Sequence, residues 1–566
     1  MVPSVQLSED LPCPLRDGVV LRADVYRPAD RGKYPVLLCR TPYDKKRAEY
    51  RAIAACLAER GYVAVVQDIR GRNASEGQWM WHMCAEGRAI EAEDGFEACQ
   101  WAAGLRGADG QVGTWGNSYP SWLIWRMAAA RPPALKAIFN SGFAARTLEC
   151  TYGVFETGIR LRWQHHMAVS SRRRSGVTGF PRTVAEANHN WDRLLRGRWI
   201  WHLPLDEVPD ALFGPDAAMQ RRYWSEIDQE LWALDADYPI VEVPTMTLTG
   251  WWDRLSQCSF HFTGMRRDGP PATRELHRLS IGPWVHEVES QTPWQGPRPQ
   301  APAGRLDLVG ELTRWYDHHL KGRDTLDTRG PVRLFLLNES GWRRFDDWPP
   351  QEAQPTPLFL SSGGAANTPS GDGTLVFQPP GAQAPDRYDY DPADPVLSLV
   401  GPDGQAAACD QAPLAARRDI LVYQTPPLTE DVVLAGPISC RLWIASDAPD
   451  TDFFVRLIEV GADGMAVNIS QGLMRCRYRL GYDRPVSLEP DTATTIDIAM
   501  LPVGIRFRRG ARIRVDVTSS DFPSFDRNHN TGRPFQSDPE LRVARQTVFH
   551  DVDHPSHIVL PVLTDG

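Results

Sequence analysis

The sequence predicts an α/β core that is interrupted by a helical insertion and followed by an all-β C-terminal domain. Three observations predict it: strand-like runs alternate with helix-like segments at first, this pattern stops and later returns, and period-2 alternation dominates the last third. With 566 residues the chain is too long for one hydrophobic core. The expected boundaries are 1–145 and 240–350 for the core, 146–239 for the insertion, and 351–566 for the C-terminal domain.

The N-terminal part contains the elements of an open sheet covered by helices. Apolar runs predict strands at Tyr34–Cys39, Tyr62–Asp68 and Leu135–Ser141. Helix-like patterns predict helices at 48–60, ended by a glycine, and at 87–102. The run at 62–68 is almost continuously apolar, which is typical of a parallel strand with both faces buried.

The middle and C-terminal parts follow other patterns. Between Arg146 and Pro239 tryptophans lie among arginines and helix formers without strand-like runs, which indicates the helical insertion. The α/β pattern then returns with strands at Pro244–Gly250 and Arg278–Gly282. Beyond the proline-rich segment 348–357, alternation such as that of Arg512–Val517 predicts an antiparallel sandwich of the jelly-roll type.

Composition excludes several classes of function. The net charge of −9 gives no electrostatic footprint for nucleic acid or an anionic membrane, and no stretch has the length needed to span a bilayer. The ten cysteines are scattered without a CxxC pair, so no metal site and no redox motif is expected. The first ten residues lack the pattern of a signal peptide, and a cytoplasmic protein fits best. A homo-oligomer stays an open alternative to a monomer.

The segment from Val112 to Ser121 is the most informative of the chain. It reads Val-Gly-Thr-Trp-Gly-Asn-Ser-Tyr-Pro-Ser, and a helix-like run follows it. A strand, a tight turn around a serine and a helix form the nucleophile elbow of the α/β-hydrolase fold, here with Ser118 as nucleophile. The N–H of Tyr119 would then stabilise an oxyanion. Ser121 replaces the last glycine of the usual G-x-S-x-G pattern, and a chance Gly-x-Ser in an ordinary turn is the alternative.

An acid and a base follow in the order that this fold requires. Asp253 comes just after the strand that ends at Gly250, and His286 comes just after the strand that ends at Gly282. His286 is therefore expected to reach Ser118 while donating its other ring proton to Asp253. The competing histidines precede that strand, fall in a helix, or are expected at the surface or in packing: His277, His261, His318 and His319.

Motifs along nearly the whole chain closely resemble the cocaine esterase/X-Pro dipeptidyl-peptidase family of serine hydrolases. They are Arg40–Lys45, Gln67–Arg72, Ser75–Gly77, Gly113–Tyr119, Gly250–Asp253, Ile281–His286, Trp315–Gly322, Asp346–Pro350 and Arg506–Ser520. The resemblance implies an α/β-hydrolase core, a helical cap and a C-terminal jelly roll. It also implies that Tyr43 donates its hydroxyl to the oxyanion hole beside the N–H of Tyr119.

These residues lead to the hypothesis of a serine hydrolase that cleaves a small-molecule ester or amide through an acyl-enzyme, without metal or organic cofactor. Phe143, Trp163 and Trp252 are the candidates for lining the acyl pocket. X-Pro dipeptidyl-peptidases of this kind are longer at the N-terminus, whereas this chain starts almost at the core, which favours an esterase or amidase. An X-Pro peptidase, an acyltransferase that uses the same acyl-enzyme, and a non-catalytic binding protein stay open as alternatives.

Overall fold

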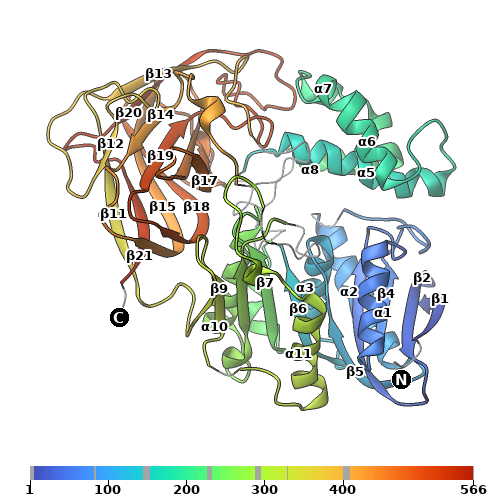
Figure 1. Cartoon of the computed structure of the whole chain (residues 1–566). Helices are drawn as coiled ribbons and strands as arrows, with labels where there is room; N and C mark the ends of the chain where they lie inside the picture. Colours follow the sequence, from blue (N-terminus) through green and yellow to red (C-terminus); the bar gives the residue numbers. More distant parts are fainter. Residues whose placement is uncertain are drawn as a thin grey trace.

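Two large β-sheets and a group of helices make up the chain (Figure 1). The structure is a computed structural model, and it describes residues 5–81, 84–143, 153–225, 233–286, 293, 295–327, 329–399 and 408–564. Within these ranges no helix is long and apolar enough to cross a membrane.

The first sheet has ten strands in the order β1-β2-β4-β3-β5-β6-β7-β8-β9-β10. The strands from β3 to β9 pair in parallel, and β1, β2 and β10 pair antiparallel at the two edges. Their bounds are β1 (Val5–Pro14), β2 (Val20–Pro28), β3 (Tyr34–Thr41), β4 (Val63–Asp68), β5 (Ala108–Thr114), β6 (Leu135–Ser141), β7 (Thr245–Gly250), β8 (Arg278–Gly282), β9 (Val332–Phe335) and β10 (Trp342–Phe345).

Helices cover both faces of this sheet. They are α1 (Ala48–Glu59), α2 (Ala85–Ala103), α3 (Tyr119–Ala129), α10 (Ser259–Asp268) and α11 (Leu308–Lys321). Strand β4 shows the consequence: Val63 and Val65 belong to the apolar cluster under α2 and α3, while Ala64 and Val66 belong to the cluster under α1 and α11. A strand buried on both faces needs apolar residues at successive positions, which explains the continuous apolar run seen in the sequence.

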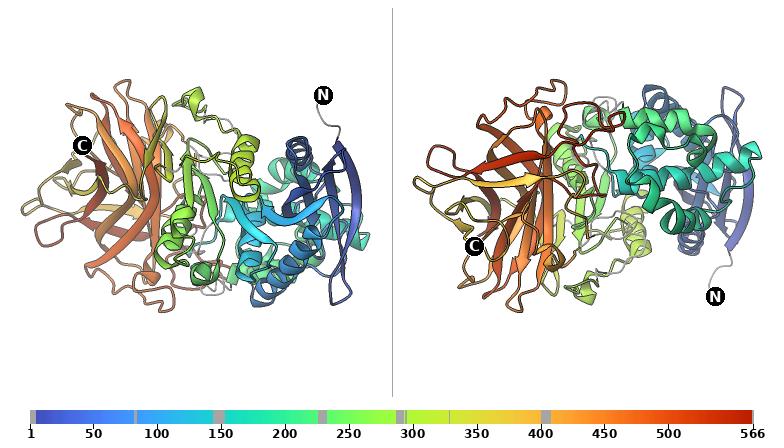
Figure 2. Two further views of the ribbon diagram at one scale, coloured as in Figure 1. Left: turned by 90° about the horizontal axis from the view of Figure 1, so that it is seen from below. Right: turned by 90° about the horizontal axis from the view of Figure 1, so that it is seen from above.

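Among the described residues between β6 and β7, four α-helices belong to the cap: α5 (Thr157–Ser175), α6 (Val184–Asn190), α7 (Arg196–Trp199) and α8 (Ala217–Ser225). Figure 1 shows them above the core sheet, and in the right-hand view of Figure 2, seen from above, they lie in front of it. The Arg72 side chain, just beyond β4, donates to the Met167 carbonyl oxygen of α5 at 2.8 Å. Leu161 and Met167 also share one apolar cluster with Trp79 of the core. The cap therefore packs on the edge where the parallel strands end.

The second sheet has eleven strands and is barrel-like, because β15 pairs with β18, β20 and β21. Burial alternates cleanly along some strands, as in β13, where Tyr388 and Tyr390 are buried while Arg387 and Asp389 are exposed. The bounds are β11 (Ala353–Ser361), β12 (Thr374–Val376), β13 (Asp386–Tyr390), β14 (Leu421–Gln424), β15 (Val432–Ser446), β16 (Asp452–Val460), β17 (Ala466–Arg475), β18 (Thr494–Phe507), β19 (Arg512–Thr518), β20 (Ala544–Phe549) and β21 (His557–Leu563).

The predicted fold class is confirmed: an α/β core carries an inserted group of helices and is followed by an all-β part. The described strands of the core sheet lie between residues 5 and 345, and those of the second sheet lie between 353 and 563. We propose 1–145 with 240–350, 146–239, and 351–566 as the three domains.

Trp251, just beyond β7, connects the core sheet to the C-terminal all-β part, which is called the sandwich below and contains strands β11 to β21. Its indole N–H donates to the Phe335 carbonyl oxygen of β9 at 2.7 Å, and its ring lies 6.1 Å from that of Trp348, centroid to centroid. Gly504 of β18 packs so closely on the indole that a Cβ at this position would overlap ring carbon Cζ2. The segment after β7, which continues to Asp253, is thus held by the sandwich.

We expect Gly504→Ala to lower the free energy of unfolding by about 1–3 kcal/mol, because the added methyl group overpacks the contact with Trp251. Calorimetry against a Gly197→Ala control checks this, since a Cβ at Gly197 meets nothing within 4 Å. Equal melting temperatures for the two variants would show that the junction is looser than the structure indicates.

Candidate active site

Ser118 occupies the turn between β5 and α3 in a conformation that a residue with a side chain rarely adopts. Its φ is 64° and its ψ is −125°, and it occupies the N-cap position of α3 without a capping hydrogen bond from its side chain. Such a backbone costs about 1–3 kcal/mol and persists only where the surroundings hold it. Here the Ser118 N–H donates to the Ser141 carbonyl oxygen at 3.0 Å, which ties the turn to the end of β6. The geometry is that of a nucleophile elbow, with the Ser118 side chain partly exposed.

Ser121 has a structural role that explains its departure from the usual glycine. Its hydroxyl donates to the Gly116 carbonyl oxygen at 2.7 Å and accepts the Ser141 N–H at 2.9 Å. The side chain thereby bridges the two ends of the elbow and strand β6. A glycine at this position would lack both contacts.

Asp253 and His286 meet beside the elbow. Nδ1 of His286 lies 2.9 Å from Oδ1 of Asp253, which also accepts the Leu255 N–H at 2.8 Å. Asp253 is fully buried, and His286 is 8% exposed. Burial by itself raises the pKa of the Asp253 carboxyl, but the charge of His286 and the hydrogen bonds from His286 and Leu255 outweigh it and hold that pKa below its usual value. The carboxylate therefore stays ionised and orients the Nδ1 proton of the imidazole toward itself.

Gly142 marks the point where these groups converge. A Cβ at this position would lie 2.5 Å from Oδ1 of Asn117, 3.0 Å from Oδ2 of Asp253 and 3.3 Å from Cε1 of His286. Gly142 directly follows Ser141 and has a φ of 55°. The acid, the base and the residue before Ser118 thus surround one backbone position, so the structure brings Asp253 and His286 together beside the elbow that contains Ser118.

Tyr43 reaches the same place from the loop after β3. Burial raises the pKa of its phenol, while hydrogen bonds with the side chains of Trp163 and Ser118 lower that pKa only in part, so the hydroxyl keeps its proton at neutral pH. The Tyr43 ring lies edge-to-face against Tyr119, with 6.3 Å between the ring centroids. Tyr119 is the first residue of α3, so its N–H belongs to the donors that point out of the helix N-terminus.

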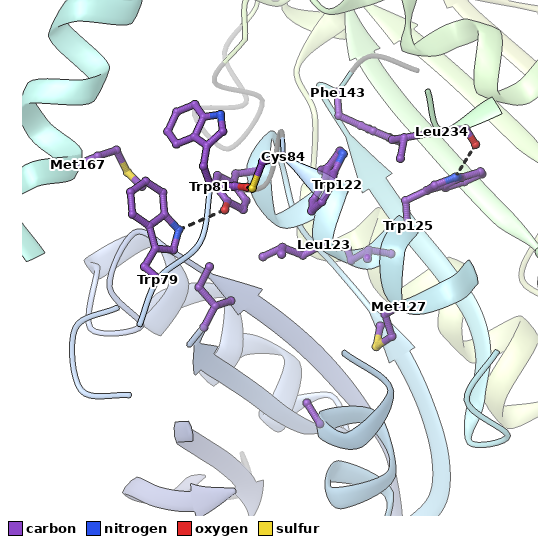
Figure 3. Packing of buried hydrophobic residues seen from close by; sticks show 14 of the residues in the cluster. Trp79, Trp81, Cys84, Trp122, Leu123, Trp125, Met127, Phe143, Met167 and Leu234 are labelled. Carbon is purple, nitrogen blue, oxygen red and sulfur yellow. Dashed lines mark hydrogen bonds between the residues drawn. The ribbon is translucent and has the colours of Figure 1, made fainter. Parts of the chain in front are cut away.

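Three tryptophans lie near Tyr43 and form a group that we call the aromatic cluster: Trp79, Trp81 and Trp163. The ring of Trp81 lies 5.5 Å from that of Trp79 and 5.2 Å from that of Trp163, both edge-to-face. The indole N–H of Trp79 donates to the Tyr119 hydroxyl at 3.3 Å, the dashed line beside Trp79 in Figure 3. Trp79 and Trp81 are 2% exposed, whereas Trp163, which comes from the cap helix α5, is partly exposed.

The other predicted pocket residues, Phe143 and Trp252, are each 3% exposed. Phe143 stacks on His261 at 4.2 Å between ring centroids, on the side where Trp125 lies (Figure 3). Trp252 belongs to the apolar cluster shared with the sandwich. Their role in lining an acyl pocket stays a prediction.

The competing histidines have other surroundings. His277 is buried, its Nδ1 lies 2.9 Å from the Thr245 hydroxyl, and burial lowers its pKa to about 3. His261 lies in α10 with its Nδ1 3.1 Å from the Tyr238 hydroxyl. His319 packs on Trp315, with 4.1 Å between the centroids, and the Nδ1 of His318 lies 3.1 Å from the Arg323 carbonyl oxygen.

Sequence reasoning missed the residues that support the site, namely Asn117, Ser141, Gly142, Trp79, Trp81 and His166. His166, on α5, lies 6.2 Å from the Tyr43 ring, and burial lowers its pKa to about 3. A signal existed for Asn117, which lies in the Gly113–Tyr119 motif, and for Trp79 and Trp81, which closely follow the Ser-Glu-Gly motif. In the part of the chain that the structure describes, no group of three His, Cys, Asp or Glu side chains could hold a metal ion.

Comparison with known proteins identifies the family of the chain. Residues 17–287 match the X-Pro dipeptidyl-peptidase (S15) family, and residues 325–559 match the X-Pro dipeptidyl-peptidase C-terminal non-catalytic domain. The chain is 33% identical to cocaine esterase of Rhodococcus sp. (strain MB1 Bresler), with 97% of each protein covered.

Two solved structures share the whole architecture. An α-amino acid ester hydrolase is 25% identical, with a TM-score of 0.74 over 99% of this chain and 97% of that one. An aminopeptidase from a Thaumarchaeota archaeon of marine sediment is 23% identical, with a TM-score of 0.78 over 100% of this chain and 97% of that one. At this identity the similarity shows a shared fold. The chain therefore belongs to the cocaine esterase/X-Pro dipeptidyl-peptidase family of serine hydrolases and hydrolyses ester or amide bonds.

Proposed function

We propose that this chain is a carboxylic-ester hydrolase whose catalytic triad is Ser118, His286 and Asp253. The observation that carries the proposal is the 2.9 Å contact between Nδ1 of His286 and the buried carboxylate of Asp253, beside a serine in a strained elbow. Because Nδ1 donates to the carboxylate, Nε2 is left as the basic nitrogen of the imidazole. Nε2 can therefore accept the proton of the Ser118 hydroxyl.

Acylation follows from this arrangement. The Ser118 oxygen attacks the carbonyl carbon of the substrate while Nε2 of His286 accepts its proton, and the carbonyl π electrons move onto the carbonyl oxygen. Asp253 stays ionised and stabilises the imidazolium. The tetrahedral intermediate then collapses: the bond to the leaving alcohol breaks, and His286 returns the proton to the leaving oxygen.

Deacylation repeats these steps with water. His286 takes a proton from the water as its oxygen attacks the acyl carbon, the bond to Ser118 breaks, and the proton passes to the Ser118 oxygen. In both halves the Tyr43 hydroxyl and the Tyr119 N–H are the donors proposed for the oxyanion. The raised pKa of Tyr43 suits this role, because a phenol that keeps its proton can donate it to the developing charge.

The surroundings of Ser118 favour an apolar or aromatic group in the substrate. Trp163 contacts Tyr43, and its partly exposed ring offers a flat apolar surface beside the proposed oxyanion hole. In the described part of the cap, Asp206, Glu207 and Asp210 are exposed to solvent, and Asp210 pairs with Arg221 at 2.6 Å. An aryl ester is therefore the substrate class that we favour over an amino acid ester.

We also propose that the protein works in the cytoplasm. The buried cysteines Cys13, Cys99 and Cys440 form no disulfide, and burial raises the pKa of their thiols. Reduced, buried thiols of this kind are typical of proteins that fold in a reducing compartment.

Replacing Ser118 by alanine should abolish both ester hydrolysis and labelling by a fluorophosphonate, because the attacking oxygen is gone. Tyr43→Phe should still be labelled, with kcat lowered roughly 100-fold to 1000-fold through the loss of one oxyanion donor. Tyr34→Phe, which removes a hydroxyl bonded to Asp30 on the surface, is the control and should keep full activity. Labelling of Ser118→Ala at the rate of the wild type would refute the assignment.

Gly142→Ala should lower kcat roughly 100-fold, because its methyl group would displace Asn117, Asp253 and His286 from one another. Gly176→Ala is the matched control: Gly176 also has a positive φ, 70°, but a Cβ there meets nothing within 4 Å. Both variants carry the same kind of backbone strain, so only the first should lose activity. Equal kcat values would mean that the three groups are not held as close as described.

A panel of aryl esters, amino acid esters and X-Pro anilides tests the substrate class. We expect the highest kcat/KM for aryl esters and a loss of roughly 10-fold on them in Trp163→Ala, with acetyl esters of small alcohols little changed. Trp201→Ala, which removes an exposed cap tryptophan that packs on Phe522, is the control. A preference for X-Pro anilides would replace the ester proposal by a peptidase, and product trapping by added alcohol would indicate an acyltransferase.

A further inference from the structure

We propose that Asn117 is a positioning residue that sets the place of His286 relative to Ser118. The side-chain Nδ2 of Asn117 donates to the backbone carbonyl oxygen of His286 at 3.0 Å. Asn117 directly precedes Ser118, so a single side chain connects the nucleophile's own turn to the backbone of the base. This inference rests on the proposed function, because it gives Asn117 a role only if His286 acts on Ser118.

The orientation of the Asn117 amide follows from two of its partners, His286 and Ser141. The His286 carbonyl oxygen can only accept a hydrogen bond, so the NH₂ group of the amide must face it. The amide oxygen then faces Ser141, whose hydroxyl lies 2.9 Å from it and 3.0 Å from the Gly116 carbonyl oxygen and shares its one proton between these two acceptors. With 9% of its surface exposed, Asn117 has little access to water as a substitute partner. Both ends of the amide are thus fixed.

The backbone of Asn117, which donates this hydrogen bond through its side chain, belongs to a rigid part of the fold. Asn117 forms a parallel β-bridge with Ser141 at the end of β6, and the next residue donates its N–H to the Ser141 carbonyl oxygen at 3.0 Å. Ser141 therefore holds the backbone of the elbow and the side chain of Asn117 at once. The position of the Asn117 amide is therefore set by the backbone of the elbow.

His286, in contrast, lies in a loop beyond the sheet. Strand β8 ends at Gly282, and the Trp252 N–H holds the loop by donating to the Trp284 carbonyl oxygen at 3.2 Å. Two residues further on, Asn117 binds the His286 carbonyl oxygen itself. Since the imidazole turns with its backbone, fixing this carbonyl oxygen fixes the direction from which the ring reaches both Asp253 and Ser118. A shift of about 1 Å in such a group can cost roughly 100-fold in rate.

The space for this bond exists because residue 142 is glycine. A Cβ there would come within 2.5 Å of the Asn117 amide oxygen and within 3.3 Å of the His286 ring. Asn117 and Gly142 are therefore a matched pair: the glycine leaves the room that the amide and the imidazole fill.

Asn117→Val tests the proposal, because valine keeps much of the volume and removes both polar atoms. We expect kcat for an aryl ester to fall roughly 10-fold to 100-fold while KM changes less than about twofold. The low-field proton resonance of the imidazole N–H that faces Asp253 should broaden or move. Asn117→Asp, which places a second acceptor opposite the His286 carbonyl oxygen, should show the same losses, and Ser141→Ala a smaller one.

Asn367→Val is the matched control, since Asn367 makes the same kind of bond in the sandwich, from Nδ2 to the carbonyl oxygens of Arg387 and Arg418. It should lower the melting temperature without changing kcat or the low-field resonance. The positioning role is overturned if Asn117→Val keeps kcat within about twofold of the wild type. It is also overturned if both Asn117 variants lose activity with an unchanged resonance. Failure of the proposed function is a separate result: the fluorophosphonate adduct of the wild type would then not be on Ser118.

Discussion

The backbone of Ser118, held at a φ of 64°, is the constraint on which the rest of the structure depends. An unfavourable conformation of this kind survives only where neighbouring groups over-determine it. The Ser118 N–H is bound by the Ser141 carbonyl oxygen, and the Ser121 hydroxyl links Gly116 to the Ser141 N–H. The end of strand β6 therefore holds the elbow in place through Ser141.

Each of the three parts of the chain contributes something that the others lack. The core sheet supplies Ser118, Asp253 and His286 from the ends of its parallel strands, and the cap brings Trp163 to the Tyr43 hydroxyl. The sandwich holds Trp251 between β9 and Gly504, two residues before Asp253. Loss of the contact between Gly504 and Trp251 would thus shift Asp253, although the sandwich does not contact Asp253 through this residue.

Much of this could be predicted from the sequence, because parallel strands carry a strong local signal. Strands β6 and β8 have the predicted bounds. The position directly after a strand favoured His286 over the four competing histidines. The contacts that hold the site residues in place, such as those of Asn117, could not be predicted. Nothing in the spacing of Asn117 indicates that its amide lies 3.0 Å from a carbonyl oxygen 169 residues away. Such contacts depend on the packing of loops, for which the sequence has no periodic pattern.

Strand β19 shows the same limit in the sandwich. The alternation of Arg512–Val517 predicts one apolar and one charged face. In the structure Arg514 and Asp516 are both buried and pair at 2.6 Å. The pattern gave the strand correctly, but burial on the second face depends on tertiary partners that only the complete fold supplies.

The most direct test of the central claim is to trap the acyl-enzyme. The wild-type protein would be mixed with an activated aryl ester, quenched in acid within the first turnover, digested and mapped by mass spectrometry. Acylation of Ser118 in the peptide that contains Gly116 and Ser121 is the expected result. An acyl group on any other residue, or full turnover without an acylated intermediate, would contradict the assignment of Ser118 as nucleophile.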